Sequence, residues 1–427
     1  MKFRFKLIKC LANLPFAILL LLSIAAFSIL GSIIEQDQPL EFYKNIYNSS
    51  ILGFIDGYKI ILYFGLDHVF KTWWFIGLLL IFGSSLTCCT FLQQLPSLKS
   101  VRKIKFYKSN KIFTSLPVSR RVMFRSNGKV IVTLIAKNYR IFQSLDKTYA
   151  NKGIIGRISP IIVHFSMVII LVGTIFASTA GFIAQEFVPE SEIFHIQNVL
   201  NNNIVSFVPH VSGRVNDFWI SYNENHTIRQ FYTDFSLLDA KGMEIKRETI
   251  YVNHPLKYKG LTFYQTDWNI LGIRIQYDSD KPYQVPCLKQ ENNVWLAWLP
   301  SQLNRLQISN SKSGNILLDQ VITGTSFLYD NNGKMLGKGE LNEFVPTTSN
   351  LKFYDMIAET GIQIKVDPGL PLIYFGFFLL ITSIIMSYQS YSQLWIWPIQ
   401  NNLNMAGNSN RSKFEFEFEV LNLVLKL

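Results

Sequence analysis

The chain of 427 residues is short of charge and of cysteine. Charged side chains make up 16% of it and hydrophobic ones 49%, whereas soluble domains carry about 25% charged residues. This composition excludes an ordinary soluble domain and favours a membrane protein with polar parts attached. The four cysteines are Cys10, Cys88, Cys89 and Cys287, and only Cys287 falls far from an apolar stretch. A domain stapled by disulfides is therefore excluded.

Several motifs that carry chemistry are also absent. The chain has no C-x-x-C, which argues against a thiol-disulfide relay, and no C-x-x-C-H, the usual attachment motif for covalent haem. It contains no P-loop, G-x-S-x-G, dinucleotide fingerprint, H-E-x-x-H or motif-like pair of carboxylates. We therefore predict no catalytic residue and no metal site, and the residues alone do not argue for an enzyme.

Four stretches are long and apolar enough to cross a bilayer as helices, which takes about 20 residues. They are Leu14 to Ile34, Thr72 to Leu92, Ile158 to Gly181 and Leu370 to Tyr388. The first follows a basic amino terminus, as a secretory signal does. Its apolar core is too long for a signal and no small-residue cleavage site follows, so we interpret it as a retained helix.

The basic residues predict the orientation of these helices. The loop from Lys99 to Arg157 carries 15 Lys or Arg against one acid, whereas the loop from Glu35 to Lys71 has five acids against three bases. Basic loops stay on the side of synthesis, so both termini lie inside and the net charge of +12 reflects topology, with no need for nucleic acid. The predicted regions are 1–98 with spans 14–34 and 72–92, a basic stromal or cytoplasmic loop at 99–157, the third span at 158–185, an outer domain at 186–367, the fourth span at 368–390 and an inner tail at 391–427.

The pattern of the two large loops predicts β structure. In the inner loop, Arg121 to Phe124 and Val130 to Ile135 are expected to be two short strands around an Asn-Gly turn. The outer segment is rich in β-branched and aromatic residues and is large enough for a β-rich domain of its own. Its expected strands are 204–211, 218–222, 227–238 and 273–277, with turns at 212–213, 240–242 and 331–333.

Of the six histidines, His164 is the best candidate for a functional residue. It lies about one and a half turns inside the neutral apolar stretch from Ile158 to Gln185, where an ionisable side chain is costly. Two interpretations stay open: a packing histidine that donates to a neighbouring helix, or a ligand or relay. His68, at the outer start of the second span, is a weaker candidate. We expect His195, His210 and His226 to be structural or exposed.

A resemblance carries the analysis further. Residues 252–268, VNHPLKYKGLTFYQTDW, resemble a block of the ResB (CcsB) family, the System II cytochrome c biogenesis proteins of chloroplasts, cyanobacteria and many bacteria. The surroundings of His164 and the segment from Asp367 to Tyr388 are similar to the same family. The resemblance covers nearly the whole chain and implies four membrane helices with a large β-rich domain on the lumenal side.

The resemblance also implies a function. Members act with a second membrane protein, CcsA, to bring reduced haem to the C-x-x-C-H motif of apocytochromes, as part of a haem-lyase complex. For this chain it implies His164 as haem ligand or relay, cytochrome f and a soluble cytochrome c as clients, and a plastid thylakoid or cyanobacterial membrane. The alternatives are a scaffold that recruits apocytochrome without binding haem and, less favoured, a sensor. The aromatic residues of the block are either core residues or contacts to the partner or client: Tyr258, Phe263, Tyr264 and Trp268.

Overall fold

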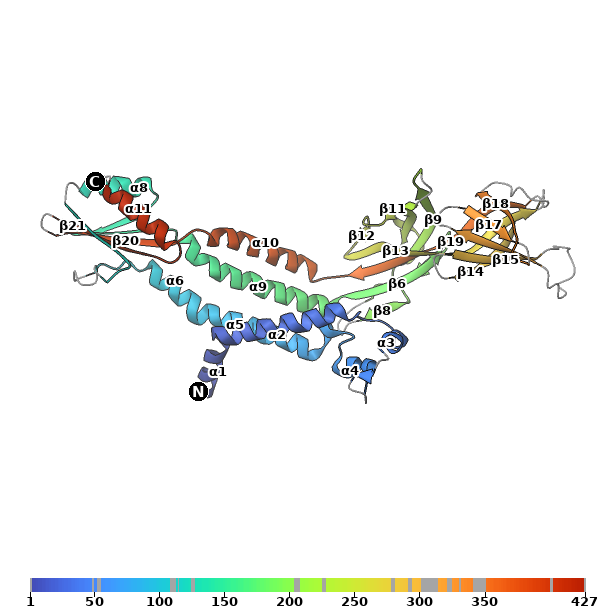
Figure 1. The fold of residues 1–427 in the computed structure, drawn as a ribbon, viewed down its shortest axis with the longest axis horizontal. Helices are drawn as coiled ribbons and strands as arrows, with labels where there is room; N and C mark the ends of the chain where they lie inside the picture. Colours follow the sequence, from blue (N-terminus) through green and yellow to red (C-terminus); the bar gives the residue numbers. More distant parts are fainter. Residues whose placement is uncertain are drawn as a thin grey trace. The chain divides into compact units, whose positions relative to one another are not determined.

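The computed structural model describes residues 2–47, 50–51, 55–107, 113, 115–123, 127–202, 208–224, 228–277, 281–290, 294–300, 314–320, 325–329, 332–340, 351–399 and 402–425 (Figure 1). The chain forms two compact units. One contains Met1–Ser178 and Gly369–Leu427, and the other is the continuous segment Thr179–Pro368. The second unit is thus inserted between two parts of the first.

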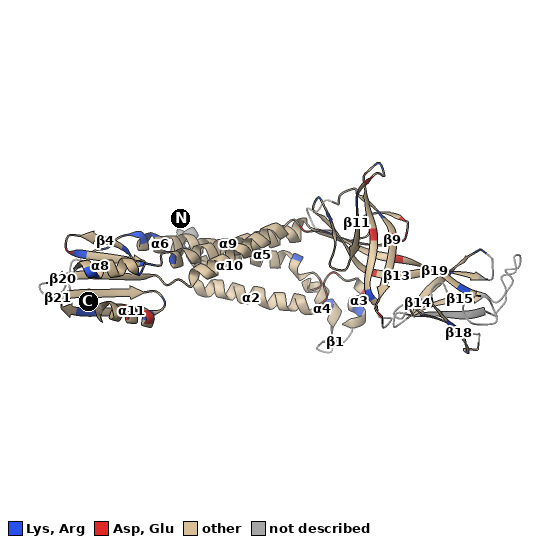
Figure 2. Cartoon of the chain, turned by 90° about the horizontal axis from the view of Figure 1, so that it is seen from above, with Lys and Arg blue, Asp and Glu red and all other residues tan. Residues whose placement is uncertain are grey.

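Within the described residues, the first unit contains four helices long and apolar enough to cross a membrane, close to the predicted positions. They are α2 (Leu14–Ile33), a continuous helical segment over Trp73–Arg102, α9 (Ile155–Ala180) and α10 (Leu370–Ser387). Their bodies carry almost no Lys, Arg, Asp or Glu (Figure 2). A short helix, α1 (Lys2–Leu11), precedes α2. The second segment is composed of α5 (Trp73–Cys89), a π-helical turn η2 (Thr90–Gln94) and α6 (Leu95–Arg102).

The connection between α2 and α5 folds back on itself. It contains α3 (Leu40–Ile46), two short strands β1 (Ser50–Ile51) and β2 (Ile55–Asp56), α4 (Gly57–Phe64) and the 3-10 turn η1 (Val69–Lys71). Tyr43 is buried among apolar side chains, and its hydroxyl donates to the carbonyl oxygen of Glu35 over 2.5 Å. Burial raises the pKa of the Tyr43 hydroxyl. This connection is therefore a packed element.

Helices α9 and α10 pack through small residues. A methyl group added at Gly369 would lie 2.0 Å from the carbonyl oxygen of Gly173, so only hydrogen fits there. Ser159 is fully buried and its hydroxyl donates to the carbonyl oxygen of Ser383 over 2.6 Å. Without a hydrophobic driving force in lipid, close backbone approach and hydrogen bonds of this kind hold membrane helices together.

A five-stranded sheet joins the inner loop to the carboxyl-terminal segment. Its order is β3-β21-β20-β5-β4, so strands distant in sequence lie side by side. Side chains of β20 alternate between the two faces of the sheet. Leu394 and Ile396 pack beneath α8 and α11, whereas Trp395 and Trp397 lie on the other face. The elements are β3 (Val118–Met123), α8 (Asn127–Ala136), β4 (Arg140–Ser144), β5 (Lys147–Lys152), β20 (Ser392–Ile399), β21 (Asn402–Ser409) and α11 (Lys413–Leu425).

The predicted strand at Val130 to Ile135 is wrong, because these residues belong to helix α8. Val130 and Leu134 are buried against the sheet, whereas Val132 and Ile135 are exposed. Burial at positions i and i+4 is the helical period, which the β-branched composition concealed. Strand β3 pairs with β21 of the carboxyl-terminal segment instead. That segment, treated above as a tail, is part of the sheet.

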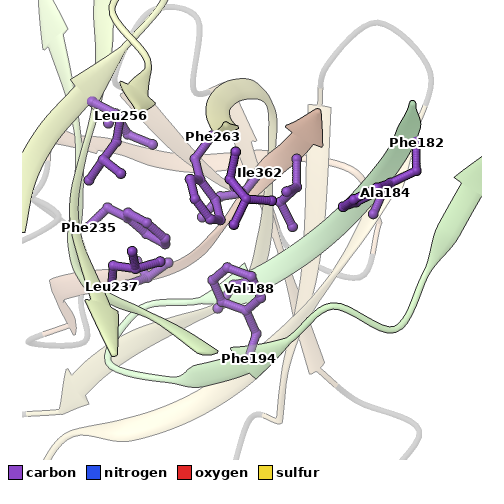
Figure 3. Packing of buried hydrophobic residues seen from close by; sticks show 13 residues of the cluster. Phe182, Ala184, Val188, Phe194, Phe235, Leu237, Leu256, Phe263 and Ile362 are labelled. Carbon is purple, nitrogen blue, oxygen red and sulfur yellow. The ribbon is translucent and has the colours of Figure 1, made fainter. Parts of the chain in front are cut away.

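The second unit is built of β-strands. A four-stranded sheet, β11-β10-β9-β7, packs on the β6, β13 and β19 part of a ten-stranded sheet, and both faces contribute to one core (Figure 3). Two long strands, β13 (Leu261–Tyr277) and β19 (Leu351–Val366), also enclose a second core with β15 and β17. The others are β6 (Phe182–Pro189), β7 (Ile193–His195), β8 (Val199–Asn202), β9 (Ser212–Tyr222), β10 (Ile228–Leu238), β11 (Glu244–Tyr251), β12 (Leu256–Tyr258), β14 (Tyr283–Gln290), β15 (Val294–Pro300), β16 (Gly314–Gln320), β17 (Thr325–Tyr329) and β18 (Met335–Glu340).

Most sequence predictions for this unit are confirmed. Strands occur at 218–222, at 228–238 and at 273–277, and turns at 240–242 and 332–333. The predicted turn at Ser212-Gly213 is wrong, because both residues begin β9. Of the expected strand 204–211, residues 208–211 are not in a strand and the rest lies outside the described residues, as do Thr227 and Asn331.

Candidate functional site

His164 meets the second membrane segment at its π-helical turn. The ring nitrogen Nδ1 of His164 lies 3.0 Å from the hydroxyl oxygen of Thr90, the first residue of η2. The imidazole is half-buried between α9 and this turn. The sequence identified the histidine but not its partner. A π-helical turn is uncommon and is found often at functional sites.

The π-helical turn has an identifiable cause. Pro96, two residues beyond it, lacks the N–H that a regular helix would need at this point, and its ring crowds the carbonyl of Leu92. One wider turn relieves that conflict. The turn is also anchored from the side, since Gln93 Nε2 donates to the carbonyl oxygen of Ala12 over 2.6 Å. Pro96 is the one sequence signal that could have indicated an irregular helix here.

The hydrogen bonds of Thr90 indicate which ring nitrogen of His164 carries a proton. The hydroxyl lies 2.8 Å from the carbonyl oxygen of Leu86 and donates its single proton there. Its lone pairs then accept from Nδ1–H of His164. This arrangement requires a proton on Nδ1, and in the neutral imidazole the lone pair then lies on Nε2. Such a second partner orients a metal-binding histidine and raises its basicity.

An apolar groove of about 410 Å³ between α5 and α9 adjoins the histidine. Val168 and Thr87, which both line the groove, lie about one helical turn from His164 and Thr90 respectively. The imidazole therefore lies at one end of an apolar surface. The groove is lined by Leu79, Leu80, Gly83, Ser84, Thr87 and Cys88 of α5 and by Val168, Leu171, Val172 and Ile175 of α9.

His68 does not join this site. It lies before η1, near the start of α5, whereas Thr90 follows the end of that helix. Seventeen residues at 1.5 Å each separate the two positions by about 25 Å. Nδ1 of His68 lies 2.9 Å from Oδ1 of Asp67, and the side chain is 46% exposed. This is a contact between neighbouring residues at an exposed side chain.

The aromatic residues of block 252–268 have different environments. Phe263 is 1% exposed and lies in the core beside Phe235 and Ile362 (Figure 3), so its side chain is no surface contact. Trp268 is half-buried, with its ring 5.4 Å from that of Phe231 and 5.0 Å from that of Trp295. Tyr258 packs against the same core as Phe263. Tyr264 is half-buried on the opposite face of β13 from Phe263.

Of the remaining histidines, His210 is exposed and His226 lies outside the described residues, whereas His195 and His254 make contacts on the second unit. Nδ1 of His195 lies 2.9 Å from the hydroxyl oxygen of Ser212. The ring of His254 stacks on Tyr251, with centroids 4.6 Å apart, across a tight turn that Asn253 enters with a φ of 68°. Neither is brought near another histidine by the described contacts.

Membrane helices that bring His164 and Thr90 into contact, with a large β unit inserted before the last helix, define a multi-pass membrane protein that carries an extramembrane β-rich domain. The profile of the ResB-like family matches residues 14–281 and 278–421. The chain belongs to this family.

Curated relatives extend over nearly the full length. The "Cytochrome c biogenesis protein Ccs1" of Thalassiosira pseudonana is 47% identical over 423 residues, covering 97% of this chain and 98% of its own. The protein of the same name from Phaeodactylum tricornutum is 43% identical over 426 residues, covering 98% and 99%. The "Cytochrome c biogenesis protein CcsB" of Crocosphaera subtropica is 41% identical over 432 residues, covering 99% and 94%.

Proposed function

We propose that this protein takes part in the biogenesis of c-type cytochromes and presents reduced haem to apocytochromes at the attachment step. Membership of the ResB-like family and full-length similarity to proteins named for cytochrome c biogenesis support the general role. Haem is the cargo of this process. The proposal assigns its capture within the membrane to the face of α9 that carries His164.

The observation that carries the proposal is the contact between Nδ1 of His164 and the hydroxyl of Thr90. With the proton held on Nδ1 by Thr90, Nε2 offers a neutral lone pair, which is the form of imidazole that binds iron. The adjoining groove offers the apolar surroundings that suit a porphyrin ring. Axial histidine and burial together control the iron potential, and thioether formation needs ferrous iron. These residues therefore fit the cargo.

The partners in this proposal are a CcsA-type membrane protein and the apocytochromes, with cytochrome f and a soluble cytochrome c as clients. The membrane is the thylakoid, since relatives occur in diatoms and cyanobacteria. The β-rich unit then faces the lumen. A reporter active only on that side should give signal when inserted in the turn at Gly242 and none after Asn127. The reverse pattern would contradict this orientation.

The test is a haem spectrum of the chain co-purified with its CcsA-type partner. We expect His164→Ala to lose or shift the reduced haem bands, His164→Gly with added imidazole to recover them, and the matched control His195→Ala to leave them unchanged. Equal recovery of both proteins in each preparation shows that the complex still assembles. If His164→Ala keeps the spectrum and haem content of the wild type, the partner handles haem alone and this chain is a scaffold for apocytochrome.

A further inference from the structure

Helix α11 of the five-stranded sheet unit is apolar on two opposite faces. One face is used within the chain, since Phe416, Val420 and Leu423 are buried in the core between the helices and the sheet. The opposite face is exposed, with Phe414 and Phe418 at 90% and 67%. We call the exposed apolar residues of this face the α11 stripe: Phe414, Phe418, Leu421 and Leu425.

The α11 stripe has the spacing of a helix–helix interface. Its members follow one another at intervals of four, three and four residues, which is the spacing of the a and d positions of a coiled coil. A helix on the surface of a sheet needs an apolar face only toward the sheet. A second apolar face on the opposite side indicates that another element packs there.

The lipid bilayer does not cover the α11 stripe along its length. Helix α11 begins beside the membrane helix α10, because Arg411 donates to the carbonyl oxygen of Ser387 over 2.6 Å. From there α11 runs along the sheet away from α10 (Figure 1). The stripe extends about 16 Å from Phe414 to Leu425, at 1.5 Å for each residue. Most of it therefore lies beyond the end of the membrane helix.

The charges beside the α11 stripe favour a basic partner. Helix α11 contains three glutamates and one lysine, so its net charge is −2. Glu417 pairs with Arg120 over 2.9 Å, and Glu419 lies between two lysines of the sheet unit. Glu415, next to Phe414, forms no ion pair with a described side chain. A second copy of this chain would bring two acidic helices together, whereas a helix with Lys or Arg beside its apolar line would be attracted.

A hollow beside the α11 stripe gives room for a side chain of that partner. It has a volume of about 400 Å³, and Glu415 and Asn422 line it from α11. These two residues are seven positions apart, so they lie on the same flank of the stripe. Lys137 and Lys152 also line the hollow, and they are the two lysines that face Glu419, each at 3.7 Å. Glu415 is left to receive a basic side chain.

We propose that the α11 stripe binds an amphipathic helix of a second membrane protein, with Lys or Arg beside its apolar line. The sheet unit includes the basic loop 99–157, so it lies on the side of the membrane where other membrane proteins are also rich in Lys and Arg. A helix laid along such a line is a common mode of recognition. The inference rests on the proposed function for one point, which is that the second protein is the CcsA-type partner.

The test measures the affinity of the full chain for its CcsA-type partner, with both proteins purified in detergent. We expect Phe414→Ser with Phe418→Ser to weaken binding about 100-fold, because buried aromatic residues carry most of the binding energy of an interface. Glu415→Lys should weaken it about 10-fold, and high salt should reduce that difference. A benzophenone amino acid in place of Phe418 should crosslink to a basic segment of the partner.

The matched control removes two exposed apolar side chains from other surfaces of the same sheet unit. Met123 lies on the sheet face away from α11, and Leu145 lies in the turn between β4 and β5. Met123→Ser with Leu145→Ser should keep the wild-type affinity. The proposal is overturned by an equal loss in this control, by wild-type affinity in the Phe414 and Phe418 double variant, or by no binding of the wild type. Crosslinks only to a second copy of the chain or to lipid would also overturn it.

Haem content separates this inference from the proposed function. If His164→Ala loses haem while the double variant of the α11 stripe binds the partner normally, this inference fails and the proposed function stands. If His164→Ala keeps haem while the double variant loses the partner, the haem role fails and this inference stands. Circular dichroism and size-exclusion profiles establish that each variant is folded.

Discussion

Helix α9 presents two faces that differ in purpose. Toward α10 it is closed: Ser159 and Gly173 bring the two backbones into contact, and the buried hydroxyl is satisfied. Toward α5 and η2 it packs through apolar side chains such as Leu171 but leaves an open groove of about 410 Å³, and Nε2 of His164 has no hydrogen-bond partner among the described residues. The comparison shows two uses of polar groups in this membrane unit. Where helix backbones touch, the polar groups hold the helices together, and where a groove adjoins them, they are available to bind a ligand.

Substitutions on the face toward α10 should lower the free energy of unfolding more than substitutions on the other face. Gly369→Ala places a methyl group 2.0 Å from the carbonyl oxygen of Gly173, so the helices must separate. We expect a loss of about 3 kcal/mol or more in the free energy of unfolding, near the upper end for overpacking. Thermal unfolding of the purified protein in detergent measures it.

Gly77→Ala is the control for this substitution, because nothing lies within 4 Å of the added methyl group. Alanine there should stabilise α5 by up to about 1 kcal/mol. If Gly369→Ala and Gly77→Ala have the same unfolding temperature, α9 and α10 are not in contact through glycine. The distinction between the two faces of α9 would then be lost.

Substitutions on the face toward α5 and η2 should change haem binding and leave the free energy of unfolding unchanged. Thr90→Val keeps the shape of the side chain but removes the acceptor for Nδ1–H of His164. On the proposed function, haem affinity should fall about 10-fold, the usual effect of losing the second partner of a ligating histidine. A haem titration of the complex measures it.

Thr174→Val controls for the loss of a hydroxyl from a membrane helix at a residue outside the groove lining. Its hydroxyl donates to the carbonyl oxygen of Ile170 over 2.9 Å and does not meet the histidine. Haem affinity should stay at the wild-type value in this variant. An equal loss in both variants would show that the helix surface, and not the orientation of the imidazole, controls haem binding.

The sequence predicted the features that leave a local trace. Long apolar stretches marked the four helices, and a lone ionisable residue within one of them marked His164. Pairing between distant strands leaves no such trace, so the union of β3 with β21 could not be predicted. Composition misled at Val130 to Ile135, where tertiary packing on a sheet favours a helix over β-branched propensity. Thr90 was missed because the π-helical turn moves a residue out of regular register.

The smallest expected effect concerns a single hydrogen bond on the closed face. Ser159→Ala removes the hydroxyl that donates to the carbonyl oxygen of Ser383. That carbonyl oxygen keeps its place in the backbone hydrogen-bond pattern of α10. Interhelical hydrogen bonds in membranes contribute about 0.6 kcal/mol on average, so thermal unfolding should reveal a loss of about that size. Haem content should not change, because this face does not meet His164. A change in haem content with unaltered stability would mean that the two faces of α9 are coupled through the helix, and their separation into packing and chemistry would fail.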